Sequence, residues 1–283
     1  MKMFLHQLRN ELWKLFGKKR TYIGFGVFLV AQNAMLLMFH FGRGWKTFYE
    51  RALEGNGYLV EDYISALTVA LIMLFPQILL LMPLYTGLVG GDLVAKEAED
   101  GTLRMILCRP VSRRRLLALK GLAGVIFSVV QVLALGVMAL LFARLWFPWR
   151  GMFVIIPDPE HIFAVLGVAE GLKLYALSHL FLAFNASTMM TIAFTFGCFN
   201  MKPAAATILA ISFLLLNLVL ENIPALAEYR PYMLLHHFRA WVIIFGQPVD
   251  WARVAGSLVV LAGFNATCLV IAGTAFQLRD IKS

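Results

Sequence analysis

Six long apolar runs constrain this chain more than any other feature of its sequence. They cover roughly residues 22–41, 64–89, 116–142, 172–199, 204–220 and 254–276. A helix that crosses the hydrocarbon core of a bilayer needs about 17 to 25 mostly apolar residues, because all of its backbone polar groups must be satisfied inside the segment. The runs meet that requirement. We therefore expect an all-α polytopic membrane protein with six transmembrane helices in a single domain over residues 1–283.

Composition argues against one large soluble core. Hydrophobic residues make up 60% of the chain and charged residues 14%, whereas a soluble domain averages about 45–50% apolar and about 25% charged residues. The three cysteines, Cys108, Cys198 and Cys268, lie far apart, and two of them fall inside apolar runs. We interpret them as packing residues rather than as a disulfide or metal set, and we expect no metal site.

The distribution of Lys and Arg predicts the orientation in the membrane, because cytoplasmic segments retain an excess of these residues. With the N-terminus inside, 16 of the 25 Lys and Arg residues lie on the cytoplasmic side. Six are in the first 20 residues, seven lie between residues 96 and 120, and the others are Lys202, Arg279 and Lys282. We expect a multi-pass protein of a bacterial or archaeal plasma membrane, the cell inner membrane, with both termini cytoplasmic.

Residues 221–252 complicate this topology. The stretch YMLLHHFRAWVIIF (residues 232–245) has only 14 residues and carries His236, His237 and Arg239 in its middle. That length is typical of a re-entrant or interfacial helix rather than a span. We expect short outer re-entrant helices here, before the last span; if the stretch crossed the membrane, the C-terminus would lie outside. The adjacent histidines point to different sides of a helix, which favours interfacial residues over metal ligands.

Residues 1–20 predict an amphipathic helix that lies along the cytoplasmic leaflet. Apolar side chains recur there at steps of three and four, and Lys and Arg mostly occupy the other faces. The apolar positions are Phe4, Leu5, Leu8, Leu12, Leu15 and Phe16. We also expect cationic side chains near this helix and before the third run to anchor the protein at lipid headgroups. These candidates are Lys18, Lys19, Arg20, Arg113, Arg114 and Arg115.

The densest mixed charge of the chain lies between the second and third runs. Residues 90–115 contain the sequence GDLVAKEAEDGTLRMILCRPVSRRR. Asp92 is a candidate N-cap for a short helix through Glu99, and Gly101 is a candidate residue to end that helix. A short helix with both charge signs beneath the membrane, followed by an apolar patch, is typical of a docking surface for a soluble partner.

A second short helix is expected over residues 102–108, with Leu103 on its apolar side and Arg104 opposite. Ser112 can then cap the helix that continues into the third run. The arginines after Ser112 occupy the first turn of that helix, where the macrodipole disfavours cations. Lipid phosphates or acidic groups of a partner can offset this cost, and ordinary cytoplasmic anchoring is the simpler interpretation of these arginines taken alone.

The stretch GDLVAKEAEDGTLRMILCRPVSRRRLLALK resembles the characteristic loop of the type-2, exporter-class permease subunits of ATP-binding-cassette (ABC) transporters. Those subunits show Glu-x-x-x-Gly-Thr-Leu-Arg, then Arg-Pro-x-Ser-Arg and a later Lys. The matching positions are Glu97, Gly101, Thr102, Leu103, Arg104, Arg109, Pro110, Ser112, Arg113 and Lys120. ELWKLFGKKRTYIGF (residues 11–25) also resembles the interfacial helix of that family. Importer-class permeases have a related loop in which the Gly lies farther after the Glu and Leu precedes the Pro. Here Gly101 follows Glu97 closely and Arg109 precedes Pro110, which argues against an importer.

The resemblance implies a permease subunit that forms the translocation pathway and has no catalytic site of its own. Two copies, or one copy with a sister subunit, would form a dimer, and each would dock on a cytosolic ATPase that carries ATP and magnesium. The residues implied in coupling to the ATPase are Asp92, Lys96, Glu97, Glu99, Asp100, Gly101, Thr102, Leu103 and Arg104. For Glu97 and Arg104, a pair that only stabilises the loop is the alternative interpretation.

Other function classes find less support in the sequence. The chain lacks the Gly-x-x-x-x-Gly-Lys-Ser/Thr loop of an ATPase and the motifs of common membrane-embedded enzymes. A stand-alone secondary transporter or channel remains an alternative, but such carriers usually place ionisable groups at mid-membrane. Here we expect neutral polar groups in the spans, with interhelical hydrogen bonding as their ordinary role. The pathway candidates among them are Gln32, Asn33, Gln77, Gln131, Asn185 and Asn217.

Overall fold

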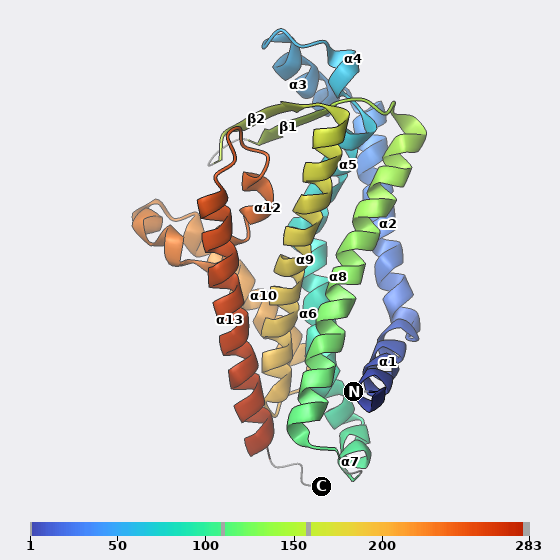
Figure 1. Ribbon diagram of the computed structural model, residues 1–283, viewed down its shortest axis with the longest axis vertical. Helices are drawn as coiled ribbons and strands as arrows, with labels where there is room; N and C mark the ends of the chain where they lie inside the picture. The colour runs from blue at the N-terminus through green and yellow to red at the C-terminus, as the bar shows by residue number, and fades with distance from the viewer. Residues whose placement is uncertain (1, 109–110, 157–159, 280–283) are drawn as a thin grey trace.

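The computed structural model of the protein describes residues 2–108, 111–156 and 160–279. It is an elongated bundle of long helices with small elements at both ends (Figure 1). Six helical segments of the described residues are long and apolar enough to cross a membrane. They are Thr21–Phe41, Ala66–Glu99, Arg113–Trp146, Val168–Cys198, Pro203–Glu221 and Trp251–Leu278. These segments correspond one to one with the six apolar runs, which confirms the predicted fold class.

The bundle begins with α1 (Lys2–Phe16), α2 (Lys19–Phe41), α3 (Arg43–Glu54) and α4 (Val60–Tyr63). The second span consists of α5 (Ala66–Pro76), the π-helical segment η1 (Gln77–Leu81) and α6 (Met82–Glu99). There follow α7 (Thr102–Leu107), α8 (Arg113–Trp146), β1 (Met152–Ile156), β2 (Ile162–Leu166) and α9 (Val168–Cys198). The chain continues as α10 (Pro203–Glu221), η2 (Pro224–Tyr232), α11 (Leu234–His237), α12 (Ala240–Ile243) and α13 (Trp251–Leu278).

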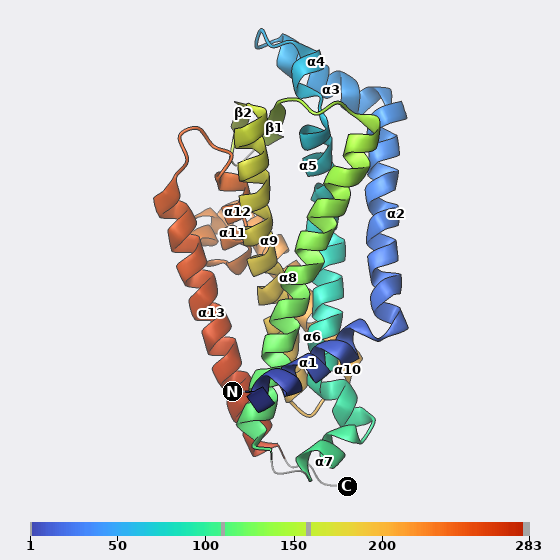
Figure 2. The ribbon, with the colours of Figure 1, turned by 45° about the vertical axis from the view of Figure 1, so that its right-hand side comes forward.

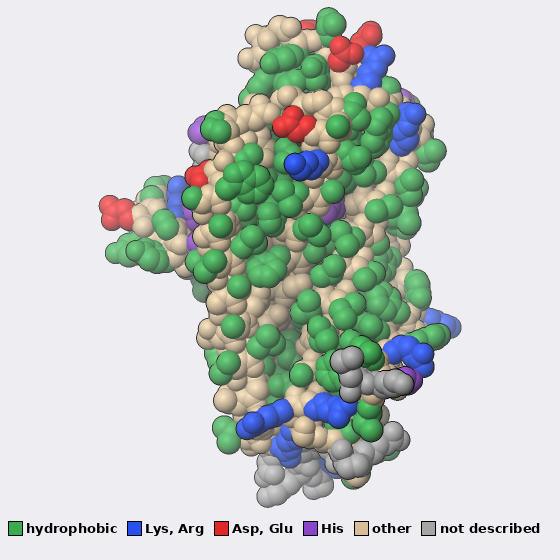
Figure 3. All heavy atoms as spheres, in the orientation of Figure 1, with side chains coloured by type: hydrophobic (Ala, Val, Ile, Leu, Met, Phe, Trp, Pro, Cys, Tyr) green, Lys and Arg blue, Asp and Glu red, His purple; other side chains and the backbone are tan. Residues whose placement is uncertain are grey.

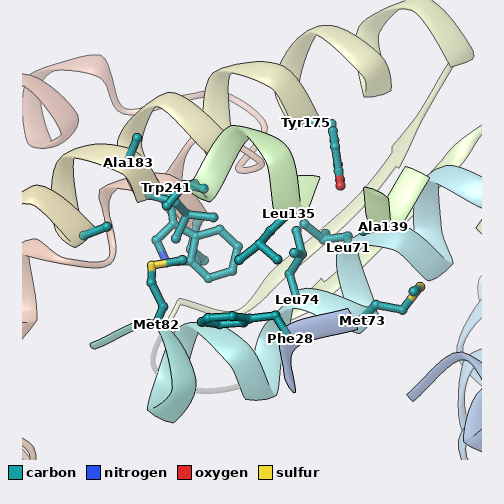
Figure 4. Packing of buried hydrophobic residues seen from close by; sticks show 14 of the residues in the cluster. Phe28, Leu71, Met73, Leu74, Met82, Leu135, Ala139, Tyr175, Ala183 and Trp241 are labelled. Carbon is teal, nitrogen blue, oxygen red and sulfur yellow. The ribbon is translucent and has the colours of Figure 1, made fainter. Parts of the chain in front are cut away.

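The core of the bundle forms around α9. In the most apolar 18-residue window of each span, 78% of the positions are buried in α9, against 22% in α2 and 17% in α13. Figure 4 shows Leu71 and Leu74 of α5 close to Leu135 of α8, with Phe28 of α2 beside them. The peripheral helices α2 and α13 therefore present much of their apolar surface outward, as expected where lipid or another subunit covers it.

Glycines let the central helices approach closely. A Cβ atom placed on Gly90 of α6 would lie 2.3 Å from the backbone oxygen of Met190 on α9. A Cβ atom on Gly136 of α8 would lie 2.3 Å from the His179 ring on α9. Small residues at such crossings allow backbone-to-backbone packing, which is the main source of helix association in lipid. These two positions explain why α9 can be enclosed by α6 and α8.

The second span is one continuous helix despite its two prolines. Pro76 ends α5, Pro83 lies in the first turn of α6, and η1 between them adjusts the backbone by one wide turn. The side-chain amide of Gln77 donates to the backbone oxygen of Met73 at 2.9 Å. A π-bulge beside proline is a familiar way to keep a helix continuous while bending it. The 34-residue segment Ala66–Glu99 is about 51 Å long, more than the ~30 Å thickness of the hydrocarbon core.

The expected short helix capped by Asp92 is wrong. Asp92 is buried inside α6, which runs without a break from the membrane to Glu99. Gly90 and Gly91, just before Asp92, are used for close packing inside the same helix: a Cβ atom on Gly91 would lie 2.7 Å from the Thr207 hydroxyl of α10. Because neighbouring helices enclose α6 at this point, the two glycines keep the helical backbone conformation, although glycine readily adopts others.

Sequence reasoning also missed the one hairpin among the described residues. β1 and β2 pair antiparallel, with Met152 opposite Leu166 and Ile156 opposite Ile162. The hairpin covers one end of the bundle next to α3 and α4, and α7 lies at the opposite end (Figure 1). The backbone amide of Phe153 donates to the Thr68 hydroxyl at 2.9 Å, which joins the hairpin to α5. Short strands of this kind give a weak signal in a sequence dominated by helical runs.

Between the last two spans the chain forms the short helices η2, α11 and α12, rather than a further span-length helix. Two span amides hold this segment against the bundle. The Asn185 side chain of α9 donates to the backbone oxygen of Phe238 at 2.8 Å, and the Asn217 side chain of α10 accepts from the backbone amide of Leu234 at 3.2 Å. These two hydrogen bonds therefore hold the segment against α9 and against α10, the helix that precedes it in the chain.

The Gly90 crossing gives the first prediction. Gly90→Ala should lower the free energy of unfolding by about 1–3 kcal/mol, because its new methyl group would meet the backbone of α9. Gly87→Ala is the matched control on the same helix, since a Cβ atom there has no neighbour within 4 Å. Thermal unfolding in detergent micelles measures both. Equal melting temperatures for the two variants would show that the crossing is not as close as described.

Candidate functional site

The end of α6 and the start of α7 form an elbow at one end of the bundle. Gly101 joins the two helices with a positive φ of 72°, in the left-handed region that glycine adopts readily. The Thr102 hydroxyl donates to the backbone oxygen of Glu97 at 3.2 Å, and Leu103 is buried with 1% exposure. Gly101 therefore ends α6 as predicted, whereas Leu103, expected in an apolar patch beside the docking surface, is buried against the bundle.

The outward side of the elbow carries charge and one large apolar residue. Lys96 pairs with Glu99 at 2.9 Å and with Asp100 at 3.1 Å, both across exposed groups. Arg104 and Met105 of α7 are exposed, Met105 to 65%. Figure 2 shows α7 beyond α1 at this end of the bundle, away from the spans. Acidic, basic and apolar groups are thus presented together on one accessible surface.

The inward side of the elbow contains a charge network that connects three helices. Glu97 of α6 accepts from Lys120 of α8, with Oε1 2.8 Å from Nζ, and from Lys14 of α1 at 3.1 Å. Glu11 of α1 pairs with the same two lysines, at 3.0 Å to Lys120 and 2.7 Å to Lys14. We call Glu11, Lys14, Glu97 and Lys120 the charge network. Its two carboxylates and two ammonium groups balance in formal charge.

Three of the four side chains of the charge network are largely buried, so their charges need partners inside the protein. The Lys120 side chain is 1% exposed, and those of Glu11 and Glu97 are 10% and 18% exposed. An ammonium group removed from water to this extent requires both opposite charge and hydrogen-bond acceptors, and removing a partner leaves an uncompensated buried charge. Lys120 therefore fixes the positions of α1 and α6 relative to α8.

The pKa values of the α1 members are displaced in the directions expected for such pairing. Burial alone would raise the pKa of Glu11, but the charges and hydrogen bonds of Lys120 and Lys14 outweigh it and hold the pKa below its ordinary value. Burial alone would lower the pKa of Lys14, but Glu11 and Glu97 raise it above its ordinary value. The Glu11 contribution to stability is lost as pH falls through its lowered pKa, and the Lys14 contribution is lost as pH rises through its raised pKa.

The other matched loop residues lie around the network. Ser112 caps α8 as predicted, since its hydroxyl accepts from the backbone amide of Arg115 at 3.3 Å. The predicted positions Arg109 and Pro110 lie outside the described residues. Sequence reasoning placed Glu97 and Lys120 in one motif but did not pair them, and it missed Glu11. The signal for Glu11 was its three-residue spacing from Lys14 on an otherwise apolar helix face.

The expected headgroup anchors divide into different roles. Arg113 donates to the backbone oxygens of Gln277 at 3.1 Å and Arg279 at 3.0 Å, so it caps the C-terminus of α13. Arg279 in turn donates to the oxygen of Phe199 at 3.2 Å, after the end of α9. Among the described side chains of the remaining candidates, those of Lys19 and Arg114 are exposed and those of Lys18 and Arg115 are half-buried. The side chain of Arg20 is outside the described set.

A cavity of about 560 Å³ opens between the second, fourth and fifth spans. Its walls are mostly apolar and come from α5, η1, α6, α9, α10 and the short helices α11 and α12. Both prolines of the second span, Pro76 and Pro83, line it, together with Leu215 and Trp241. The π-helical segment η1 and the two prolines thus coincide with the cavity, as expected if the prolines open space rather than only adjust packing.

Polar groups gather at one end of this cavity. Glu221, at the end of α10, has a side chain only 2% exposed and pairs with Arg239 at 2.8 Å. Glu160 accepts a two-pronged bond from Arg253, at 2.8 and 2.9 Å, and lies 3.8 Å from Arg239. His236 lies beside them, and burial together with the cations Arg253 and Arg239 lowers its pKa. The cavity therefore joins an apolar chamber to a compensated but charged rim.

Asn185 is the predicted pathway residue that lines this cavity. The amide of Gln32 donates instead to the backbone oxygen of Leu135 at 2.9 Å, and those of Asn33 and Gln77 bond within their own helical segments. Asn217 supports the short helices, and Gln131 is fully buried in α8. Most of these side chains therefore serve interhelical or local hydrogen bonds, the ordinary role foreseen for them. The charged cavity residues Glu160, Glu221 and Arg239 were not anticipated.

Comparison with known proteins now gives the family. The family model described as "ABC-2 family transporter protein" matches residues 13–271, which is most of the chain and includes the cavity and, of the charge network, Lys14, Glu97 and Lys120. The chain belongs to this family. It is also similar to the uncharacterized protein YhcI of Bacillus subtilis strain 168, with 22% identity over 317 aligned positions that cover 99% of this chain and 100% of that protein. The resemblance inferred from the loop is confirmed, and the chain is an ABC transporter permease.

The charge network of this permease gives the second prediction. Lys120→Met should lower the free energy of unfolding by about 3–5 kcal/mol, because Glu11 and Glu97 would keep only Lys14 as a partner. The double variant Lys120→Met/Glu11→Gln should recover part of the loss, since it removes the excess negative charge. Thermal unfolding in micelles measures each variant. Lys96→Met, which breaks exposed pairs, is the control and should change little; a wild-type melting temperature for Lys120→Met would contradict the network.

Proposed function

We propose that the protein is the transmembrane subunit of an ABC exporter, driven by a separate ATPase that docks on the elbow of α6 and α7. The observation that carries this proposal is the continuous second span. It begins at the hairpin end, changes to a π-helical segment at η1 where it lines the cavity, and ends at Glu99 in the elbow. A displacement of the elbow is therefore transmitted along a single helix to the cavity wall.

The charge network determines which helices take part in this displacement. Glu97 lies two residues before the end of α6 and is paired with Lys14 and Lys120. A push on α7 cannot move α6 alone, because separating these pairs would expose or strand buried charges. The force would be shared with α1 and α8, and the bundle would move between two arrangements rather than deform gradually. This supports the coupling role expected of Glu97.

Partners and orientation follow from the same surface. The elbow is the described surface where mixed charge and an exposed Met105 occur together, which suits a soluble protein rather than lipid. Docking requires this end to face the cytoplasm, in agreement with the excess of Lys and Arg on the same side. We propose that both termini are cytoplasmic and that ATP and magnesium are bound by the partner. The permease would act as a homodimer or beside a sister subunit.

The cavity suggests the class of cargo. Its apolar walls suit an amphipathic or lipid-like molecule, and the charged rim formed by Glu160, Glu221 and Arg239 suits a polar head. Pairing of the carboxylates with arginines keeps the rim stable when empty and leaves charged groups that a headgroup can engage. We propose outward movement of such a molecule, with the cavity as part of its pathway.

Docking is testable at Cys108, which is exposed at the end of α7. A membrane-impermeant maleimide should label it in inside-out vesicles and not in right-side-out vesicles. The ATPase recovered with the permease from native membranes should protect Cys108 when added back. Arg104→Glu should abolish protection and ATPase stimulation, whereas Arg51→Glu at the opposite end should not. Labelling from the outside, or transport in vesicles without nucleotide, would contradict the proposal.

The pathway is testable by filling the cavity. Leu215→Trp places a large ring on a residue that lines the chamber, while Leu216→Trp places it on the adjacent residue, which does not line it and is 56% exposed. Leu215→Trp should reduce substrate-stimulated ATPase activity about tenfold or more and leave basal activity and ATPase binding intact. The control should retain both activities. Equal stimulation in the two variants would place the pathway elsewhere.

A further inference from the structure

A second groove lies on the outer surface of the bundle, between α8 and α13. It has a volume of about 450 Å³ and is separate from the cavity proposed as the pathway, with which it shares no lining residue. Glycines form part of its floor: a Cβ atom on Gly121 would already touch Phe194 at 3.6 Å, and one on Gly273 would have no neighbour within 4 Å. Leu122 and Leu269 on its edges are exposed to 39% and 45%.

The groove combines apolar walls with cations at one end. Arg113 and Arg114 line the end at the start of α8, and Gln277 lies beside them on α13. No acidic side chain is among the described residues that line it. Figure 3 shows Lys and Arg side chains at this end of the molecule, over the lower ends of α8 and α13. The described side chains that line the groove therefore carry a net positive charge, which lies at the first turn of α8.

The dimensions of the groove match one leaflet of a membrane. Its lining on α8 runs from Arg113 to Val125, a distance of about 18 Å along the helix. Half of the hydrocarbon core is about 15 Å thick. The groove thus has a length that matches a hydrocarbon chain lying in one leaflet.

We propose that this groove binds one anionic phospholipid from the leaflet on the elbow side. Its phosphate lies on Arg114 and on the free donors of Arg113, and one acyl chain follows the channel over Gly121 and Gly273. Charge complementarity favours an anionic over a zwitterionic lipid, because the described residues that line the groove include cations and no acid. The lipid also covers part of α13, the span with the smallest buried share. Arg113 takes part both in binding the lipid and in holding α13, because it lines the groove and caps the C-terminus of α13.

Native mass spectrometry of the full chain in detergent tests this site. With added phosphatidylglycerol, the wild-type protein should retain one lipid in preference to phosphatidylcholine. Arg114→Gln should lower retention of phosphatidylglycerol about fivefold, the effect expected for one cation near a headgroup. Lys202→Gln, which removes an exposed cation at the same end of the bundle but outside the groove, is the control and should retain the lipid.

A second pair of variants tests the channel itself. Gly273→Leu fills the groove and should lower lipid retention at least as much as Arg114→Gln, whereas Gly263→Leu, on the same helix and outside the groove, should not. Wild-type retention in Gly273→Leu would overturn the proposal. So would equal binding of glycerol 3-phosphate, which would indicate a free-phosphate site, or a change of oligomeric state in Gly273→Leu with lipid retention intact, which would indicate a protein contact.

Discussion

The buried ammonium group of Lys120 is the interaction on which the arrangement at the elbow depends. A lysine with 1% of its side chain exposed cannot remain charged without acceptors, and its acceptors come from α1 and α6, helices far apart in the sequence. The cost of burying the charge thus specifies one relative position of three helices. Apolar packing alone would tolerate sliding of α1 along the bundle, because hydrophobic contacts are not directional.

The second span connects this arrangement at the elbow with the wall of the cavity. The helix that carries Glu97 at its end also lines the cavity through Pro83 and, beyond η1, Pro76. The π-helical segment is the one place in this span where the hydrogen-bond pattern changes, so motion of the elbow would be expressed there as bending. The proposed docking surface at one end and the cavity wall farther along are thus connected by one helix, as the proposed drive by a separate ATPase requires.

The charged side chains of the described residues form two groups. One group is buried or caps helix ends and holds the helices together, and the other is exposed at the elbow. Paired groups are buried at both ends of the spans: the charge network beside the elbow, and Glu160 and Glu221 with their arginines at the cavity rim. Arg113 and Arg279 cap the ends of neighbouring helices. These side chains connect helix ends at positions where backbone carbonyls would otherwise lack partners. Lys96, Glu99 and Asp100 are exposed, and they belong to the surface on which we propose that the ATPase docks.

The sequence by itself determined the class of the fold, the six spans, the elbow at Gly101 and the family resemblance. These follow from local properties: the length of apolar runs, the left-handed backbone of one glycine and a short motif. Tertiary structure decided the rest. It enclosed Asp92 in α6, paired Lys120 with Glu11 across 109 positions, and brought Glu160 and Glu221 to one cavity. These outcomes depend on which helices pack together, and helical periodicity specifies the face of each helix without naming its neighbour.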